Sequence, residues 1–239
     1  MSGHSKWSTI KRKKGAADAK RGVIFTRLSK DITLAAREGG GNIEMNPALR
    51  LAIKKAKSVN MPSSNIERAI KKGTGELPGI RYEDFEYEGY GPHSVAILIE
   101  IMTDNKNRTL PEIRSIMTKN GGSLGESGCV NWMFEKKGIF TVQTSEIDEN
   151  KLMELLENSD IEDIIFDDNL FEIIVRSDDF KLISNIFDKS KINYDGEISL
   201  VPQNLIQLNS DEANQVIRLL ELIENHDDVQ KVHTNFQIQ

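Results

Sequence analysis

The stretch that decides the fold is residues 139–200, IFTVQTSEIDENKLMELLENSDIEDIIFDDNLFEIIVRSDDFKLISNIFDKSKINYDGEISL. In this stretch, runs rich in β-branched and aromatic residues alternate with segments whose apolar residues recur at helical spacing. We expect strands at 139–142, 161–167, 170–175 and 193–200, and helices at 150–158 and 179–189. The order βαββαβ is that of a ferredoxin-like domain, which we place at residues 136–202.

The segments on either side of this domain also read as mixed α and β structure. Before it we expect strands at 85–90 and 95–102, a helix at 109–119, a glycine-rich turn and a strand near 129–134. After it we expect strands at 205–208 and 229–236 around a helix at 211–225. This last unit shows no separate core, so we predict a discontinuous α+β domain, 78–135 plus 203–239, with the ferredoxin-like domain inserted in it.

The N-terminal third, residues 1–77, reads as a three-helix bundle. A first helix at 16–38 ends at a run of glycines, and Asn46-Pro47 caps a second helix. Ser64 and Glu67 form a capping box for a third helix that ends at Gly73. The expected inward residues are Phe25, Leu28, Ile32, Ala36, Leu49, Ala52, Ile53, Ala56, Val59, Ile66, Ala69 and Ile70. The fold class is therefore α+β and multidomain: a helical bundle followed by two α/β sandwiches.

The charge is strongly polarised along the chain, although the net charge is only −6. The first 75 residues hold 17 basic and five acidic residues, a charge of +12, and the remainder holds 14 basic and 32 acidic residues, a charge of −18. A basic third on an acidic body points to a polyanionic partner such as a nucleic acid. The alternative is a solvated charged face that has no partner.

The basic residues lie in an N-terminal arm, residues 2–15, and on one face of each of the three helices. In the arm, serines and the aromatic Trp7 interleave with cations, a mixture suited to phosphate contact and base stacking. The alternative for Trp7 is packing onto the bundle. The predicted nucleic-acid-binding residues are His4, Lys6, Trp7, Lys11, Arg12, Lys13, Lys14, Lys20, Arg21, Arg27, Lys30, Arg37, Arg50, Lys54, Lys57, Arg68, Lys71 and Lys72.

No segment of the sequence assembles a catalytic or metal site. The glycine-rich segment 121–128 lacks the lysine of a P-loop and precedes a strand, so we interpret it as a structural turn. Cys129 is the single cysteine, and the four histidines lack paired ligand spacing. The acidic run at 83–88 is interpreted as an exposed strand face rather than a metal site. We expect a non-enzymatic, cytoplasmic protein without cofactor or metal, and we expect no membrane segment, because the longest apolar run is 95–99.

Several motifs occur in order along the chain. They are Gly3-His4-Ser5-Lys6-Trp7, Asp18-Ala19-Lys20-Arg21-Gly22, Ala35-Ala36-Arg37-Glu38-Gly39-Gly40, Asn60-Met61-Pro62, Asn65-Ile66-Glu67-Arg68-Ala69-Ile70-Lys71-Lys72-Gly73, Tyr87-Glu88-Gly89-Tyr90-Gly91-Pro92, Thr103-Asp104-Asn105-Lys106-Asn107-Arg108-Thr109 and Gly121-Gly122-Ser123-Leu124-Gly125. With them the chain resembles the YebC/PmpR family over essentially its whole length. It departs at Ser63-Ser64, where a basic-acidic pair is usual, and at Cys129, where serine is usual.

The resemblance implies a three-domain, non-enzymatic DNA-binding transcriptional regulator. Mitochondrial relatives are translational activators, and bacterial relatives have been connected with stalled ribosomes, so a ribosome-binding factor that contacts ribosomal RNA is the alternative. The break after the first helix is too long for a helix-turn-helix, which weakens the case for sequence-specific operator binding. We further expect that the acidic domains are free to bind a protein partner.

Overall fold

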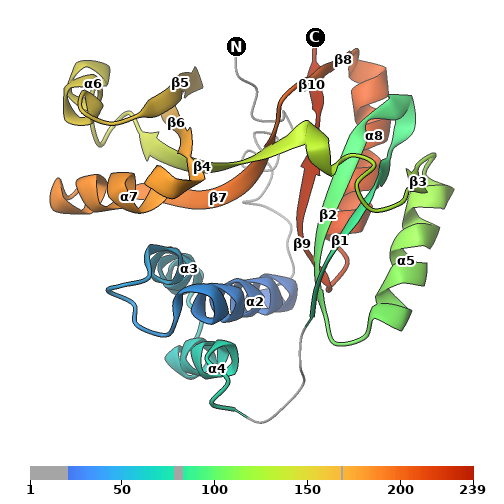
Figure 1. Cartoon of the computed structure of the whole chain (residues 1–239), viewed down its shortest axis with the longest axis horizontal. Helices are drawn as coiled ribbons and strands as arrows, with labels where there is room; N and C mark the ends of the chain where they lie inside the picture. Colours follow the sequence, from blue (N-terminus) through green and yellow to red (C-terminus); the bar gives the residue numbers. More distant parts are fainter. Residues whose placement is uncertain (1–20, 78–82, 168) are drawn as a thin grey trace.

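The computed structural model of this chain describes residues 21–77, 83–167 and 169–239 (Figure 1). In that part of the chain, helices come first and two mixed α/β units follow, each built on its own sheet of four strands. The mixed α+β character predicted from the sequence is confirmed.

The N-terminal helices are α2 (Arg21–Gly39), α3 (Pro47–Ser58) and α4 (Ser63–Gly73), and α2 packs against both of the others. Asn46 joins α2 to α3: its side-chain oxygen caps α3 at the Leu49 N–H, and its amide donates to the Ala35 and Gly40 carbonyls. Because this buried amide satisfies carbonyls at the end of one helix and an N–H at the start of the next, it fixes the connection between them.

Two details of the bundle differ from the sequence prediction. The capping box is wrong: α4 begins at Ser63, Pro62 is its N-cap, and no side chain caps it. The Pro62 carbonyl instead accepts from the Asn65 and Ile66 N–H groups, so the helix starts two residues earlier and Ser64 lies inside its first turn. Val59 is only half-buried, whereas Leu51, which was not predicted to be inward, is buried.

Gly73 allows α4 to pack closely on α2. A Cβ atom at this position would lie 2.4 Å from the Thr33 carbonyl oxygen and 2.7 Å from the Ala36 Cβ atom. No real Cβ atom makes contacts that short, so the last turn of α4 requires glycine because of packing. The bundle core that results contains Ile32, Ala36, Leu49, Ile53, Ala56, Ile66 and Ala69.

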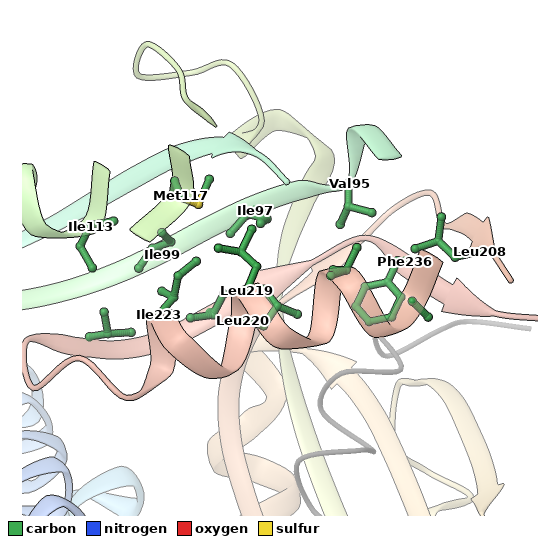
Figure 2. Packing of buried hydrophobic residues seen from close by; sticks show 14 of the residues in the cluster. Val95, Ile97, Ile99, Ile113, Met117, Leu208, Leu219, Leu220, Ile223 and Phe236 are labelled. Carbon is green, nitrogen blue, oxygen red and sulfur yellow. The ribbon is translucent and has the colours of Figure 1, made fainter. Parts of the chain in front are cut away.

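The middle unit is a sheet in the order β3-β1-β2-β9, with antiparallel neighbours throughout. Its strands are β1 (Glu83–Tyr90), β2 (Ala96–Thr103), β3 (Ser123–Leu124) and β9 (Val229–Thr234). Helices α5 (Lys106–Lys119) and α8 (Ser210–Glu224) contribute to one core with strand residues such as Ile97 and Ile99, as Figure 2 shows. Strands β8 (Ile206–Leu208) and β10 (Phe236–Ile238) form a short parallel pair, and Phe236 extends the same core.

The other unit is a sheet in the order β5-β6-β4-β7, again antiparallel. Its elements are β4 (Phe134–Gln143), α6 (Glu149–Leu156), β5 (Ile161–Asp167), β6 (Leu170–Arg176), α7 (Phe180–Lys189) and β7 (Tyr194–Pro202). This element order and strand order are those of the ferredoxin-like motif expected for residues 139–200. Its core is centred on Phe140, whose ring stacks on Phe180 with centroids 4.7 Å apart.

Three short 3₁₀ turns complete the described elements: Pro92–Ser94, Asn131–Met133 and Ser177–Asp179. The second occupies the place where the sequence predicted a strand near 129–134, so that prediction is wrong. The reason is the buried Glu88 carboxylate, which accepts hydrogen bonds from the Gly128, Val130 and Asn131 N–H groups and bends the chain around itself.

Candidate nucleic-acid interface

Among the exposed cations of the bundle are two on α4 and one near the end of α3. Arg68 and Lys71 are exposed on α4, while Ile66 and Ala69 on the same helix are buried. This separation follows from the 3.6-residue period of the helix, which turns the basic positions away from the apolar ones. Lys57 is exposed near the end of α3. These three side chains are therefore exposed, as the helical period predicts, and their binding of nucleic acid stays a prediction.

A groove of about 350 Å³ lies between α2 and α4. It is lined by Phe25, Thr26, Ser29, Lys30, Thr33, Asn65, Arg68, Ala69 and Lys72. The lining combines cations, hydroxyl and amide groups, and one aromatic ring, which are the groups that contact phosphates and stack on bases. We refer to it as the α2–α4 groove.

Lys30 was predicted to bind nucleic acid but is buried, with 6 % of its surface exposed. Its ammonium group donates to the Asp227 carbonyl oxygen and lies 3.5 Å from an Asp228 carboxylate oxygen. Burial lowers the pKa of Lys30, and the charge of Asp228 partly offsets that effect. Lys30 therefore connects the bundle to the middle unit and does not present an exposed charge.

Three further predicted cations also contact the other two units. Arg37 is ion-paired with Asp84 at the start of β1, and the Arg50 guanidinium lies 2.7 Å from the Asp188 carboxylate on α7. The Lys54 ammonium lies 3.4 Å from the Tyr194 carbonyl oxygen and 5.8 Å from the centroid of the Tyr194 ring. The sequence predicts that these three cations face a polyanionic ligand, whereas in this structure they contact the acidic units of the same chain.

The remaining predicted residues divide into two groups. Arg27 is half-buried, and its Nε and Nη2 atoms are enclosed without a hydrogen-bond partner in the residues that the structure describes. Arg21 begins α2, but its side chain lies outside the described part of the chain, as do His4, Lys6, Trp7, Lys11, Arg12, Lys13, Lys14 and Lys20.

Sequence reasoning missed Asp228, the group that holds the bundle to the middle sheet. Its carboxylate accepts from Arg108 at 2.7 Å, Thr109 at 2.8 Å and Thr103 at 3.1 Å, in addition to its contact with Lys30. Burial alone would raise the pKa of Asp228, but these hydrogen bonds and the charge of Lys30 lower it to about 2. In the sequence, nothing distinguishes the Asp227-Asp228 pair, which precedes β9, from other acidic pairs.

Lys231 on β9 is a second connecting residue that the sequence did not reveal. Its ammonium donates to the Ile198 carbonyl at 2.9 Å and lies 3.3 Å from the Glu197 carboxylate on β7. Burial opposes its charge, but Glu197, Glu100 and Asp31 outweigh this effect and raise the pKa of Lys231. Because Asp31 lies on α2 and Glu100 on β2, Lys231 experiences the charges of all three parts of the molecule.

Among the residues considered as a metal site, Glu88 has a structural role. Glu88 is buried, unlike Glu83, Asp84 and Glu86, and it binds the end of the glycine-rich loop. Burial raises the pKa of Glu88, but its three backbone hydrogen bonds outweigh burial and lower it. Among the residues described, no cluster of three or more histidine, cysteine, aspartate or glutamate side chains is arranged to hold a metal ion. Likewise, no helix in these residues combines the length and apolar character needed to cross a membrane.

Comparison with known proteins gives matches over the whole chain. Residues 5–76 match a family model described as the N-terminal domain of TACO1/YebC proteins, and residues 82–236 match one described as the second and third domain of the same proteins. A "Probable transcriptional regulatory protein" from Desulfatibacillum aliphaticivorans is 53 % identical over 239 residues, covering 100 % of this chain and 97 % of its relative. One with the same name from Syntrophobacter fumaroxidans is 51 % identical over 240 residues, covering 100 % of this chain and 96 % of the relative.

The fold also matches a solved structure. The crystal structure of a conserved hypothetical protein from Aquifex aeolicus superposes with a TM-score of 0.86 at 42 % sequence identity. The match covers 98 % of each chain, so it includes the bundle and both sheets.

Proposed function

The chain belongs to the TACO1/YebC family, and we propose that it is a non-enzymatic regulator of gene expression that binds DNA in the cytoplasm. The relatives, which are about half identical to it over its full length, carry the name "Probable transcriptional regulatory protein". The observation that carries the proposal is the exposed pair Arg68 and Lys71 on α4, beside the α2–α4 groove. Fixed cations next to polar donors and an aromatic ring suit a phosphodiester backbone.

We also propose that the chain has three domains, 1–77, 78–135 plus 203–239, and 136–202, with the last inserted in the second. The pairing of β9 with β2 supports this division, because it returns the C-terminal part of the chain to the first sheet. The acidic charge of the second and third domains would be repelled by a polyanion. The bundle is therefore the part of the molecule that should face the DNA.

Charge reversal on α4 tests the binding surface. We expect Arg68→Glu with Lys71→Glu to weaken binding of a random-sequence DNA duplex at low salt for all sequences alike, because phosphate contacts carry no sequence information. The matched control is Lys181→Glu with Lys189→Glu, two exposed lysines on α7 that give the same change of net charge. Equal loss of binding in both variants would show that total charge, and not the α4 surface, determines affinity.

A second experiment tests the target. Crosslinking of the protein in cells, followed by identification of the attached nucleic acid, should recover DNA. Recovery of ribosomal RNA instead would contradict the proposed level of action and would favour a ribosome-binding factor. The bundle geometry leads us to expect a preference for one DNA sequence well below about a thousandfold.

A further inference from the structure

Three of the cations that dock the bundle onto the acidic domains do not line the α2–α4 groove. Arg37 lies near the end of α2, and Arg50 and Lys54 lie on α3. Their partners, Asp84, Asp188 and Tyr194, belong to the other two domains. In Figure 1, α2 and α3 lie on the side of the bundle that faces the two sheets. We call Arg37, Arg50 and Lys54 the docking face.

The contacts of the docking face are of a kind that another anion can replace. The side chains of Arg37 and Asp84 are 36 % and 47 % exposed, and those of Arg50 and Asp188 are 30 % and 43 % exposed. Ion pairs this open to water are individually weak and are screened by salt. Polar contacts of this kind between domains of one chain allow relative domain motion, although here that motion must also withdraw Leu51 of α3 from the core of the ferredoxin-like domain.

The chemistry of these partners indicates the competing ligand. An arginine guanidinium presents a planar fork of donors that matches a carboxylate and a phosphate equally well. Asp84 and Asp188 thus occupy positions on the docking face that two phosphates could take. A nucleic acid supplies such phosphates in a closely spaced row, whereas the acidic domains supply separate carboxylates.

From this arrangement, and resting on the proposed function, we infer that the docking face is a second phosphodiester-binding surface, closed in this structure by Asp84 and Asp188. Nucleic acid that extends beyond the α2–α4 groove would displace the acidic domains from Arg37, Arg50 and Lys54. By linkage, a change that weakens the docked arrangement but keeps these cations strengthens binding of the nucleic acid, at most by the factor by which docking is weakened.

The test uses two variants of the full chain that break the same two ion pairs from opposite sides. Asp84→Asn with Asp188→Asn frees the arginines, whereas Arg37→Gln with Arg50→Gln removes them.

Each of these two variants has a control with the same change of net charge. Asp160→Asn with Glu135→Gln changes carboxylates that pair with Arg176 and Lys137 of the third domain, and Lys181→Gln with Lys189→Gln changes exposed lysines on α7. The probe is a random-sequence DNA duplex, titrated at several salt concentrations.

We expect Asp84→Asn with Asp188→Asn to bind the duplex more tightly than its control by between about twofold and about thirtyfold, the range for two exposed ion pairs. The slope of log K against log salt should steepen by about 0.9 for each arginine gained. Arg37→Gln with Arg50→Gln should bind no more tightly than its own control, because it opens the interface but lacks the cations.

Two results would overturn the inference while leaving the proposed function intact. One is binding by Asp84→Asn with Asp188→Asn equal to that of its control. The other is an equal gain from both interface variants, which would mean that opening the interface acts without the arginines. If neither the unchanged chain nor any variant binds the duplex at low salt, the proposed function fails and the inference fails with it.

Discussion

Asp228→Asn is the substitution that most directly perturbs the contact between the bundle and the middle domain. The shift of the Asp228 pKa from 3.8 to about 2 corresponds to about 2.5 kcal/mol, at about 1.36 kcal/mol for each pKa unit. Removing the carboxylate also leaves the buried Lys30 ammonium without its counter-charge, and breaking a buried pair from one side costs about 3–5 kcal/mol. Because Arg108 can still donate to the amide oxygen of an asparagine at 228, part of this energy is retained. We therefore expect the free energy of unfolding to fall by about 2–4 kcal/mol.

The assay is thermal unfolding of the full chain, where this loss should lower the midpoint by roughly 4–16 °C. Asp227→Asn is the matched control, since its side chain is exposed and adjacent, and it should change the midpoint little. In a background of Lys30→Met the cost of Asp228→Asn should fall, because no buried charge is then left unpaired. Equal costs in both backgrounds would refute the coupling of Lys30 with Asp228.

The pH dependence of this variant supplies a second check. The pKa of Asp228 is depressed in the folded chain, so its contribution is fully present above about pH 3.8 and is lost as the pH falls toward about 2. The difference in unfolding free energy between the unchanged chain and Asp228→Asn should therefore shrink across that window. A difference that stayed constant from pH 6 to the acid limit, on the order of pH 2, would contradict the assigned role of the carboxylate.

Two further substitutions test other contacts. Glu88→Gln places an amide NH₂ among three backbone N–H donors, so we expect the free energy of unfolding in urea to fall by about 1–3 kcal/mol. The control is Glu86→Gln on the exposed face of the strand, and an equal or larger loss in that control would contradict the role of Glu88. Leu51→Ala removes the α3 side chain that enters the core of the ferredoxin-like domain, so we expect the free energy of unfolding to fall by about 2–5 kcal/mol in the same measurement. An unchanged unfolding midpoint would show that Leu51 contributes little to the interface.

Local patterns in the sequence predicted most of the secondary structure. The period of apolar residues placed the three bundle helices, and the alternation of runs at 139–200 predicted the βαββαβ order that the structure shows. The errors arose where long-range contacts determine the local structure. The turn at Asn131–Met133 replaces a predicted strand because Glu88, some 40 residues earlier in the chain, binds its N–H groups.

The basic residues show the same limit. Periodicity correctly indicated that Arg68 and Lys71 point away from the bundle core, since that depends only on the helix itself. It could not indicate that Lys30 and Arg50 meet carboxylates of other domains, because the positions of Asp228 and Asp188 depend on how the domains pack. The charge count therefore indicates a polyanionic partner, but it does not show that carboxylates of the same chain pair with part of the basic charge.

The salt dependence of DNA binding by the full chain tests the central claim, that the α4 surface beside the α2–α4 groove binds a phosphodiester backbone. We predict a linear fall of log K with log salt for the unchanged chain. The slope should be smaller by about 1.8 when Arg68 and Lys71 are both replaced by glutamine, at about 0.9 for each phosphate that is no longer neutralised. A slope that is unchanged by this double substitution would contradict the claim, because it would mean that neither residue binds a phosphate.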